Sequence, residues 1–550
     1  MTTAADLPGE PPAANGERSR SFAGTWRLLR FLIRRDRIKL PAWVGSFGLL
    51  TIYLTNALPV AYPEEDLDSL SGLFADPAGR LLIGPSYGLD NPTYDRLIAN
   101  GYGLYFLIVA ALMSILLVVR HTRAEEQTGR AELVRASVVG AKAPLTAALI
   151  LAVITNALVA VVITALMVAA GHGGGGSFLL GVSVAAGGLA FAGLAALTVQ
   201  LTQFSRAAAG LAGAGLGLAF ALRAGGDMTR VGGNTLSWLS PLAWPQQTAP
   251  FVLDRWWPLG LSFAFAVVTA AVGFVLSTRR DLGASLLSTR TGRPTAAEWL
   301  RSPLTLALRL QRGSIVAWGA ALIISGFLYG IFTESLLTGW EDLPDTFVEV
   351  FGTGEENIVT GYLAYMSVFM AYLAAAFAIL AVHGYRSEET TGRGEPVLAA
   401  PVSRWGWLGG NLIVTAVAAV ALLAAAGAAT GAGAAIVTGE VAYVWELTAS
   451  HLGHAPAVLV LLAIAALFFG VLPRAIGLTW AVLAYGIFFG TFGGLIDPPN
   501  WLFDLSPFEH AARMPLEPFA LAPVAALTVL AAGVAALGLL GFRRRDIDTT

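Results

Sequence analysis

Long apolar stretches alternate with short polar ones along almost the whole chain of 550 residues. Each apolar stretch is about 20 residues long, which is the length that an α-helix needs to cross a bilayer. The pattern therefore predicts an all-α polytopic membrane protein with about twelve transmembrane helices. The expected spans are 42–62, 102–120, 144–170, 178–203, 206–223, 257–277, 314–333, 362–383, 408–436, 455–472, 475–496 and 519–541.

The segment before the first span divides into two parts. Residues 1–22 are polar, contain prolines and lack an apolar run, so they predict a disordered cytoplasmic tail and not a signal peptide. Residues 24–40 carry arginines at spacings of three and four, which share one face of a helix. That amphipathic helix either lies on anionic lipid headgroups or packs on the protein's own cytoplasmic face. The arginines concerned are Arg27, Arg30, Arg34 and Arg37.

The two halves of the chain repeat each other. Residues 123–132 read RAEEQTGRAE and residues 386–395 read RSEETTGRGE; at this offset of 263, ten of the seventeen positions from 123 to 139 are identical. The pattern indicates a tandem duplication of a six-span unit whose two copies have the same topology. Other landmarks that recur in order, at offsets of 263 to 275, are Trp43 with Trp318, Arg206 with Arg474, Ser240-Pro241 with Ser506-Pro507, and Arg279-Arg280-Asp281 with Arg544-Arg545-Asp546.

The duplication sets the expected domain boundaries. A first six-span half covers residues 23–282 and a second covers residues 299–550, with a cytoplasmic linker at 283–298 between them. At the start of the second half, residues 299–312 again place a polar stripe on one helical face. Amphipathic surface helices are therefore expected before the seventh span as well as before the first. The second stripe consists of Arg301, Thr305, Arg309 and Arg312.

Composition and charge narrow the class of protein. Charged residues make up 13% of the chain, against about 25% in soluble proteins, and hydrophobic residues make up 56%. A net charge of −2 offers no basic field for a nucleic-acid partner. Basic residues gather in residues 120–142, the central linker and the C-terminal tail, whereas the loops after the first and seventh spans are acidic. The positive-inside rule therefore places both termini in the cytoplasm.

Candidate catalytic and metal-binding groups are scarce. The two lysines, Lys39 and Lys142, do not follow a glycine as the lysine of a nucleotide-binding P-loop does. The six histidines are scattered, and His172, His451 and His454 are expected in loops. We expect no catalytic residue, metal or cofactor in this chain. If ATP drives its function, the ATPase is another polypeptide.

The repeated charged motif is the most specific signal in the sequence. It follows the second span of each half, and that helix is expected to continue past Arg123. Glu126 and Arg130 would then form an i,i+4 ion pair, as would Glu389 and Arg393. Acids do not help to set topology. The three acids of each copy therefore favour a docking or gating function over a charged turn that only fixes orientation.

The glycines of the motif predict where its first helix ends. Gly129 and Gly392 can adopt a positive φ, which is a common way to end a helix. A second short helix is expected to begin at Ala131 in the first copy and at Glu395 in the second.

At this point the chain resembles the permeases of type-2 ABC exporters. These permeases have six spans per half, an amphipathic helix before the first, and an R-x-x-E…G-x-x-E element after the second. The second copy matches that element and continues as AAPVSR at residues 399–404. The first copy has Val138 in place of the proline and Gly140-Ala141-Lys142 in place of Ser-Arg, so it would dock less typically. The fused Arg-rich form is most similar to actinobacterial exporters of polyketide antibiotics and other drugs.

The resemblance implies a permease that moves lipophilic drugs out of a bacterial cell across its plasma membrane. Two copies of a separate ABC ATP-binding subunit would power it and would bind the ATP and Mg²⁺. Its coupling residues would be Arg123, Glu125, Glu126, Gly129, Arg130, Glu132, Arg386, Glu388, Glu389, Gly392, Arg393 and Glu395.

The resemblance also implies a substrate path between the halves, along the first, second and fifth spans of each. Aromatic side chains can hold a lipophilic drug, although core packing or interfacial placement explains any single one more simply. The candidates are Tyr53, Tyr102, Tyr105, Phe106, Phe220, Tyr329, Tyr365, Phe369, Tyr372, Trp480, Tyr485 and Phe488. Short re-entrant helices would close the outer exit, in the loops that hold Trp238, Pro241, Trp244, Pro245 and Pro250, and Pro498, Pro499, Trp501, Pro507 and Phe508.

Other functions stay open on the sequence alone. An ion-coupled secondary transporter of the major-facilitator type also has two six-span repeats and a charged loop after the second span. Ion coupling places ionisable groups inside spans, however, and the predicted spans contain almost none. A non-transporting membrane partner in an assembly is a second alternative. A membrane enzyme is disfavoured because no paired carboxylates or nucleophile lie at membrane depth.

Overall fold

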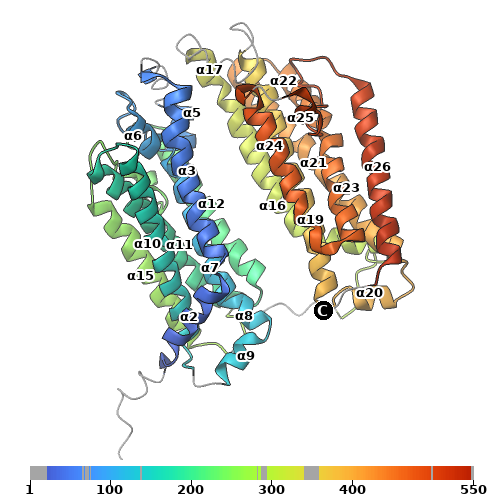
Figure 1. The fold of residues 1–550 in the computed structure, drawn as a ribbon, viewed down its shortest axis with the longest axis horizontal. Helices are drawn as coiled ribbons and strands as arrows, with labels where there is room; N and C mark the ends of the chain where they lie inside the picture. Colours follow the sequence, from blue (N-terminus) through green and yellow to red (C-terminus); the bar gives the residue numbers. More distant parts are fainter. Residues whose placement is uncertain are drawn as a thin grey trace, which may run out of the picture. The chain divides into compact units, whose positions relative to one another are not determined.

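The computed structural model describes residues 21–64, 67–68, 74, 76–136, 139–281, 283–286, 294–339, 358–496 and 499–546. These residues contain twelve helices that are long and apolar enough to cross a membrane, which confirms the predicted spans (Figure 1). The chain divides into two compact units, Met1–Gly292 (unit one) and Arg293–Thr550 (unit two). Each unit contains six of the twelve helices.

Unit one is built around helix α11, the most buried of its spans, which packs against α7, α10, α12 and α15. A Cβ on Gly181 would lie 2.6 Å from the Ala160 carbonyl oxygen on α10, and one on Gly193 would lie 2.5 Å from the Ala266 carbonyl oxygen on α15. Small residues thus let these backbones approach closely, as is usual for membrane helices. The spans of unit one are α3 (Lys39–Ala61), α7 (Gly103–His121), α10 (Ala143–Ala169), α11 (Gly174–Leu201), α12 (Ser205–Asp227) and α15 (Trp257–Ser277).

The two ends of unit one carry different short helices (Figure 1). We call the end of each unit that holds residues 123–132 or 386–395 the motif end, and the opposite end the loop end. The motif end of unit one holds α2 (Thr25–Arg35), α8 (Arg123–Gln127) and α9 (Arg130–Arg135). The loop end holds α5 (Pro77–Ile83), α6 (Tyr94–Arg96), η2 (Leu97–Gly101), α13 (Thr235–Trp238) and α14 (Ala243–Gln246).

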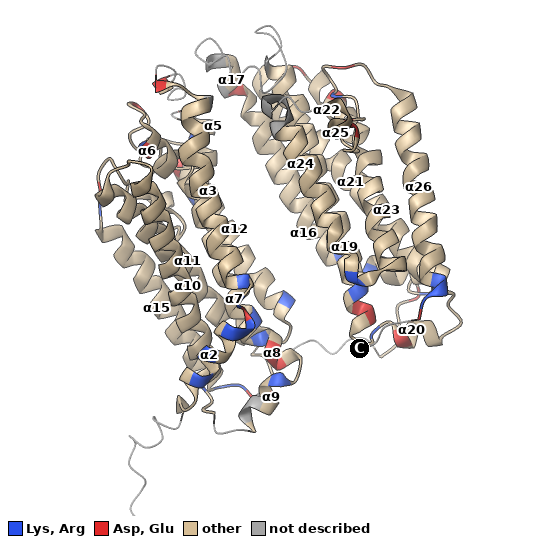
Figure 2. Cartoon of the chain, viewed as in Figure 1, with Lys and Arg blue, Asp and Glu red and all other residues tan. Residues whose placement is uncertain are grey.

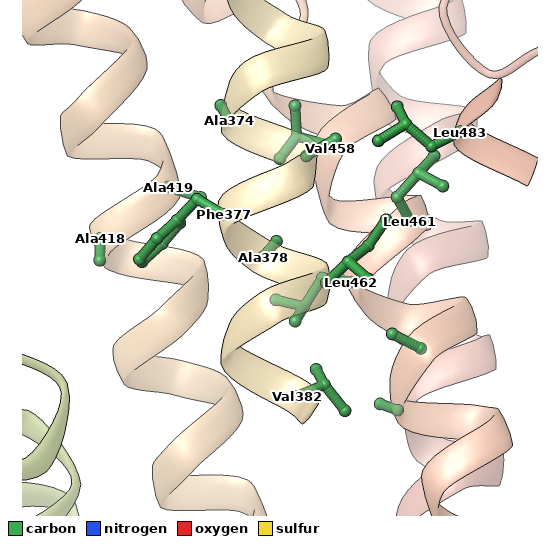
Figure 3. Packing of buried hydrophobic residues seen from close by; sticks show 14 of the residues in the cluster. Ala374, Phe377, Ala378, Val382, Ala418, Ala419, Val458, Leu461, Leu462 and Leu483 are labelled. Atoms are coloured by element: carbon green, nitrogen blue, oxygen red, sulfur yellow. The ribbon is translucent and has the colours of Figure 1, made fainter. Parts of the chain in front are cut away.

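Unit two has its core between α19, α21 and α23, where Phe377 lies close to Ala419 and Leu461 to Leu483 of α24 (Figure 3). Its spans are α16 (Pro303–Ile331), α19 (Ile358–Thr390), α21 (Arg404–Thr438), α22 with α23 (Ala442–Gly453 and Ala455–Val471), α24 (Leu478–Ile496) and α26 (Leu521–Arg544). Its short elements are α17 (Thr333–Gly339), α20 (Glu395–Ala399), η5 (Pro473–Ala475) and α25 (Asn500–Asp504).

The predicted surface helix before the first span is confirmed. α2 is separated from α3 by a turn at residues 36–38, and it buries Leu29 and Leu32 against unit one. Its four striped arginines are exposed, and so are Trp26, Phe31 and Ile33. Exposed apolar and basic side chains on one short helix are typical of a helix at a membrane interface.

The expected separate surface helix at 299–312 is wrong. Ser302 caps α16 through a capping box with Thr305, and the helix then continues without a break into the seventh span. Gln311, which corresponds to Asp36 at the offset of 275, accepts a hydrogen bond from Thr415 on α21 at 2.8 Å. The polar position that lies at a turn in unit one therefore lies inside a helix in unit two.

Two histidines also differ from expectation. His451 and His454 were expected in loops, but both are fully buried where α22 meets α23. The His454 Nε2 atom lies 3.2 Å from the Ser367 hydroxyl of α19, and the His451 Nδ1 atom lies 2.8 Å from the Leu447 carbonyl oxygen. Both histidines thus belong to a span that begins at Ala442, earlier than the predicted residue 455.

Candidate functional site

In both halves the repeated motif folds as a helical segment, a tight turn and a second short helix. In unit one the helix is interrupted at Thr122, whereas α19 of unit two continues to Thr390. Gly129 and Gly392 have φ values of +73° and +72°, and α9 and α20 begin after them. The predicted glycine ends and second helices are therefore confirmed.

The second of the two adjacent acids in each motif pairs with an arginine just after the last span of the same half. Glu126 accepts from Arg280 through both Nη atoms, at 2.7 and 2.8 Å. Glu389 accepts from both Nη atoms of Arg545, each at 2.6 Å. We call these pairs the Glu126–Arg280 clasp and the Glu389–Arg545 clasp. Bidentate pairs of this kind fix geometry as well as contributing energy.

The i,i+4 pairs expected from the sequence are wrong. Arg130 lies 4.0 Å from Glu125, and Arg393 lies 3.3 Å from Glu388, so each arginine meets the acid five positions earlier. The positive-φ glycine between them redirects the chain, and the helical spacing of side chains no longer applies beyond it.

The clasp arginines were identified in the sequence as part of a repeat, but their pairing with the motif was not predicted. Arg280 and Arg545 belong to the repeated Arg-Arg-Asp triplet, at an offset of 265. The acids of the motif and the arginines of the triplet recur at nearly the same offset, and that recurrence is the sequence signal for their pairing. Helical periodicity could not show this, because the partners of each clasp are more than 150 residues apart.

The first arginine of the motif has a different environment in each half. Arg123 is fully buried; it donates to the Thr202 and Ala284 carbonyl oxygens, each at 2.6 Å, and also to Glu126. Arg386, at the corresponding position, is partly exposed and makes no side-chain hydrogen bond or ion pair with any described residue. The motif is therefore anchored more firmly in unit one.

The motif of unit one is also joined to α2. Arg35 of α2 pairs with Glu125 at 2.6 Å. One residue later, the buried Asp36 carboxylate lies 2.9 Å from Arg120 and 2.7 Å from His121 at the end of α7. These contacts couple the position of α2 to that of the motif.

The expected coupling residues therefore form two layers. Arg123 and Glu389 are buried and Glu126 is partly buried, and their polar groups are used inside the protein. Glu132 and Glu395 are exposed, and most Lys and Arg of each unit lie at this end, whereas Asp and Glu lie at both ends (Figure 2). Of the acids and arginines, those with exposed or half-exposed side chains are Arg130, Glu132, Arg393 and Glu395.

The candidate aromatics divide between core and surface. Phe106 stacks on Phe47, and Tyr372 contacts Phe508 edge-on, so both are explained by core packing. Tyr329 and Phe369 contact each other edge-on, with Phe369 exposed on its own unit. The other exposed candidates are Tyr53, Tyr105, Trp480 and Phe488; those of intermediate exposure are Tyr102, Phe220, Tyr365 and Tyr485.

An ionisable pair that sequence reasoning missed lies inside the fifth span. Arg223 and Asp227 are both fully buried, with 3.4 Å between Nη1 and Oδ2. The Ser237 hydroxyl donates to Asp227 at 2.6 Å, and Arg223 donates to the Leu81 carbonyl oxygen of α5 at 2.7 Å. The pair thus joins the end of α12 to the short helices at the loop end.

A second polar contact holds the same region. The Tyr87 hydroxyl donates to Gln247 at 2.6 Å, and burial raises the pKa of Tyr87, although nearby Arg255 opposes that rise. The loop after the fifth span contains the short helices α13 and α14, and Trp238 stacks on Trp257. In unit two, α25 occupies the corresponding loop, and Pro498 lies outside the described residues.

Comparison with known proteins identifies relatives of the chain. Residues 300–543 match the family described as "Multidrug efflux system permease Rv1217c, C-terminal domain". The whole chain is 38% identical, over 552 aligned positions, to the multidrug efflux system permease protein Rv1217c of Mycobacterium tuberculosis, and the alignment covers 96% of each protein. An alignment of that coverage extends over both halves of the chain. The chain therefore belongs to the family of multidrug efflux permeases that this mycobacterial protein represents.

Proposed function

We propose that the chain is the membrane subunit of an ATP-driven exporter that moves lipophilic drugs out of the cell. Two copies of a separate ABC ATP-binding subunit would dock at the motif ends, which would face the cytoplasm, and those subunits would bind ATP and Mg²⁺. The mycobacterial relative is called a multidrug efflux permease, which supports the substrate class and the direction of transport.

The two clasps carry this proposal. Each holds the turn of its motif against the last span of the same half, and each leaves one acid at the start of the following short helix exposed, Glu132 or Glu395. A turn that only fixed topology would need no bidentate ion pair shielded from solvent. A turn that receives a movement from a docked partner does need such an anchor. A loosely held turn would move by itself and pass little of that movement to the spans.

The Arg223–Asp227 pair is the observation that most favours an ion-coupled transporter, because buried ionisable groups in spans often mark ion pathways. Its partners argue for a structural role instead. Both side chains are engaged by residues of the loop end, and Arg80 donates to the Asp227 and Met228 carbonyl oxygens at 3.1 Å. The ATP-driven function therefore accounts for more of the structure.

The first test is recovery of the chain from its native membrane in mild detergent, with the co-purifying proteins counted by mass spectrometry. We expect a P-loop ATPase at about two copies per chain. Recovery of the intact chain alone, together with export that stops with a protonophore while ATP remains, would overturn the proposal in favour of ion coupling.

The docking surface is tested by charge reversal of the exposed acids. Glu132→Arg together with Glu395→Arg should reduce recovery of the ATPase without changing membrane insertion. Glu440→Arg is the matched control, because Glu440 is exposed after the opposite end of α21. Equal ATPase recovery with the double variant and with the control would contradict docking at these acids. Glu389 is unsuitable for this test because it is buried in its clasp.

A further inference from the structure

An open groove runs along the outside of unit one where α2 turns into α3. Its volume is about 740 Å³, which lies within the range of sites for molecules of drug size or larger. The walls come from the end of α2, the first turns of α3 and the middle of α10. The lining residues are Ile33, Arg34, Arg37, Leu40, Pro41, Val44, Leu151, Ile154, Thr155 and Leu158.

The groove has one basic end and one apolar end. Arg34 and Arg37 lie at the turn between α2 and α3, while the strip from Leu40 to Val44 belongs to the span itself. Along α10, the lining from Leu151 to Leu158 extends about 10 Å at the helical rise, and Leu158 is exposed. A charged mouth above an apolar strip matches the shape of a lipid that has its headgroup at the interface.

The two arginines at the mouth differ from the others on α2. Arg35 is paired with Glu125, and Arg30 lies over the Trp26 ring at 5.3 Å. Arg34 and Arg37 make no hydrogen bond or ion pair with any described residue, and both are exposed.

Asp36, between these two arginines in sequence, does not neutralise them. Its carboxylate is buried and faces Arg120 and His121 on the other side of the turn. The mouth of the groove therefore carries two positive charges and no facing acid among its lining residues. A phosphate diester bears the negative charge and the oxygen atoms that the planar guanidinium group binds in a bidentate manner.

We propose that this groove binds one anionic phospholipid, with its phosphate between Arg34 and Arg37 and an acyl chain along the strip from Leu40 to Leu158. The bound lipid would hold the turn at residues 36–38, next to the contact between Arg35 and Glu125. Its occupancy would therefore steady the attachment of α2 to the motif of unit one. The inference goes beyond the proposed function, and it does not depend on whether an ATPase docks to the chain.

The test uses the purified, delipidated full chain in a nonionic detergent. Its thermal unfolding midpoint is measured during titration with dioleoyl phosphatidylglycerol, and separately with dioleoyl phosphatidylcholine. We expect phosphatidylglycerol to raise the midpoint at concentrations about tenfold below those at which phosphatidylcholine does. Native mass spectrometry should show one strongly retained phosphatidylglycerol per chain. Inorganic phosphate alone should leave the midpoint unchanged, because it lacks the acyl chain; an equal rise with phosphate would show a simple anion site and overturn the proposal.

The variants separate a specific site from general attraction to a basic helix. Arg34→Gln with Arg37→Gln should abolish the preference for phosphatidylglycerol while leaving the midpoint in phosphatidylcholine unchanged, which also shows that the variant folds. Arg27→Gln with Arg30→Gln removes the same charge from α2 outside the groove, and should keep the preference. Loss of the preference in both double variants, or in neither, would overturn the proposal.

Discussion

Glu389 and Arg545 lie 156 positions apart in the chain, yet the carboxylate accepts a hydrogen bond from each Nη atom at 2.6 Å. The guanidinium group of Arg545 also lies 5.1 Å from the ring centres of Phe469 and Phe542. The pair therefore joins a charged turn, a central span and the end of the last span of unit two.

Removal of the Glu389 charge should destabilise unit two. In Glu389→Gln, the largely buried Arg545 would keep its charge without a counter-ion, at a cost on the order of 3 kcal/mol. The measurement is thermal unfolding in mild detergent, followed by intrinsic tryptophan fluorescence. The exchanged variant Glu389→Arg with Arg545→Glu should recover only part of the loss, because the arginine would no longer lie on the two rings.

The neighbouring acid supplies the control for this prediction. Glu388 pairs with Arg393, but that arginine is about half exposed, so Glu388→Gln should cost less than about 1 kcal/mol. If the two glutamine variants unfold at the same temperature, the Glu389–Arg545 clasp does not contribute as inferred.

The two copies of the first motif arginine should respond differently to alanine. Arg123→Ala removes the donor to the Thr202 carbonyl oxygen and leaves Glu126 and the Ala284 carbonyl oxygen to Arg280 alone, so we expect a loss of about 2 kcal/mol. Arg386→Ala removes a partly exposed side chain with no polar partner among the described residues, and should cost less than about 0.5 kcal/mol. Thermal unfolding of both variants checks this, and similar losses would contradict the asymmetry between the motifs.

The close contact between α16 and α21 should not accept a methyl group. A Cβ on Gly330 would lie 2.1 Å from the Thr430 carbonyl oxygen, so Gly330→Ala must push two helices apart, at a cost of roughly 1–3 kcal/mol. Gly313, on the same helix, has open space at the Cβ position, and Gly313→Ala should be neutral or slightly stabilising. The unfolding midpoints should differ in that order; a neutral Gly330→Ala would mean that the helices pack less closely.

Substitution of the turn glycines Gly129 and Gly392 should affect stability only through the backbone conformation that the new residue must adopt. Gly129 has no neighbour within 4 Å of a built Cβ, and Gly392 has only the Glu395 carboxyl carbon, at 4.0 Å. Alanine at either position therefore costs only the positive φ, about 1–2 kcal/mol. Asparagine, which tolerates that conformation, should cost less. Gly384→Ala within α19 is the control without strain. An alanine variant as stable as the asparagine one would contradict the left-handed turn.

Hydropathy and the repeat predicted most of the fold. A run of about 20 apolar residues has few alternatives in a membrane, so all twelve spans were found. The glycine turns were also predictable, because Gly129 and Gly392 stand at matching places in a charged segment. The unbroken course of α16 was not predictable, because a polar stripe does not distinguish a separate surface helix from the polar first turns of a long helix, as at Arg309 and Arg312.

The ion pairs of the candidate site were less predictable because the two residues of each pair are distant in sequence. Helical spacing suggested Arg130 for Glu126, but the turn at Gly129 separates them, and Arg280 approaches from the last span. Buried polar contacts such as Arg223 with Asp227 escaped notice for a related reason. One or two charged residues barely change the mean hydropathy of a long apolar span. A hydropathy pattern that identifies a span therefore does not reveal the charged residues inside it.

Both clasps close within a single half: Glu126 with Arg280, and Glu389 with Arg545. Cleavage of the chain between residues 287 and 293 would separate neither pair. Each fragment would therefore keep its own clasp. Duplication and fusion of an ancestral half-size gene thus required no new contact to hold the second motif in position. The same independence lets each copy diverge separately, as the replacement of Pro401 by Val138 at the matching position illustrates. Fusion in this lineage fixes the ratio of the two halves, while the holding of each motif stays modular.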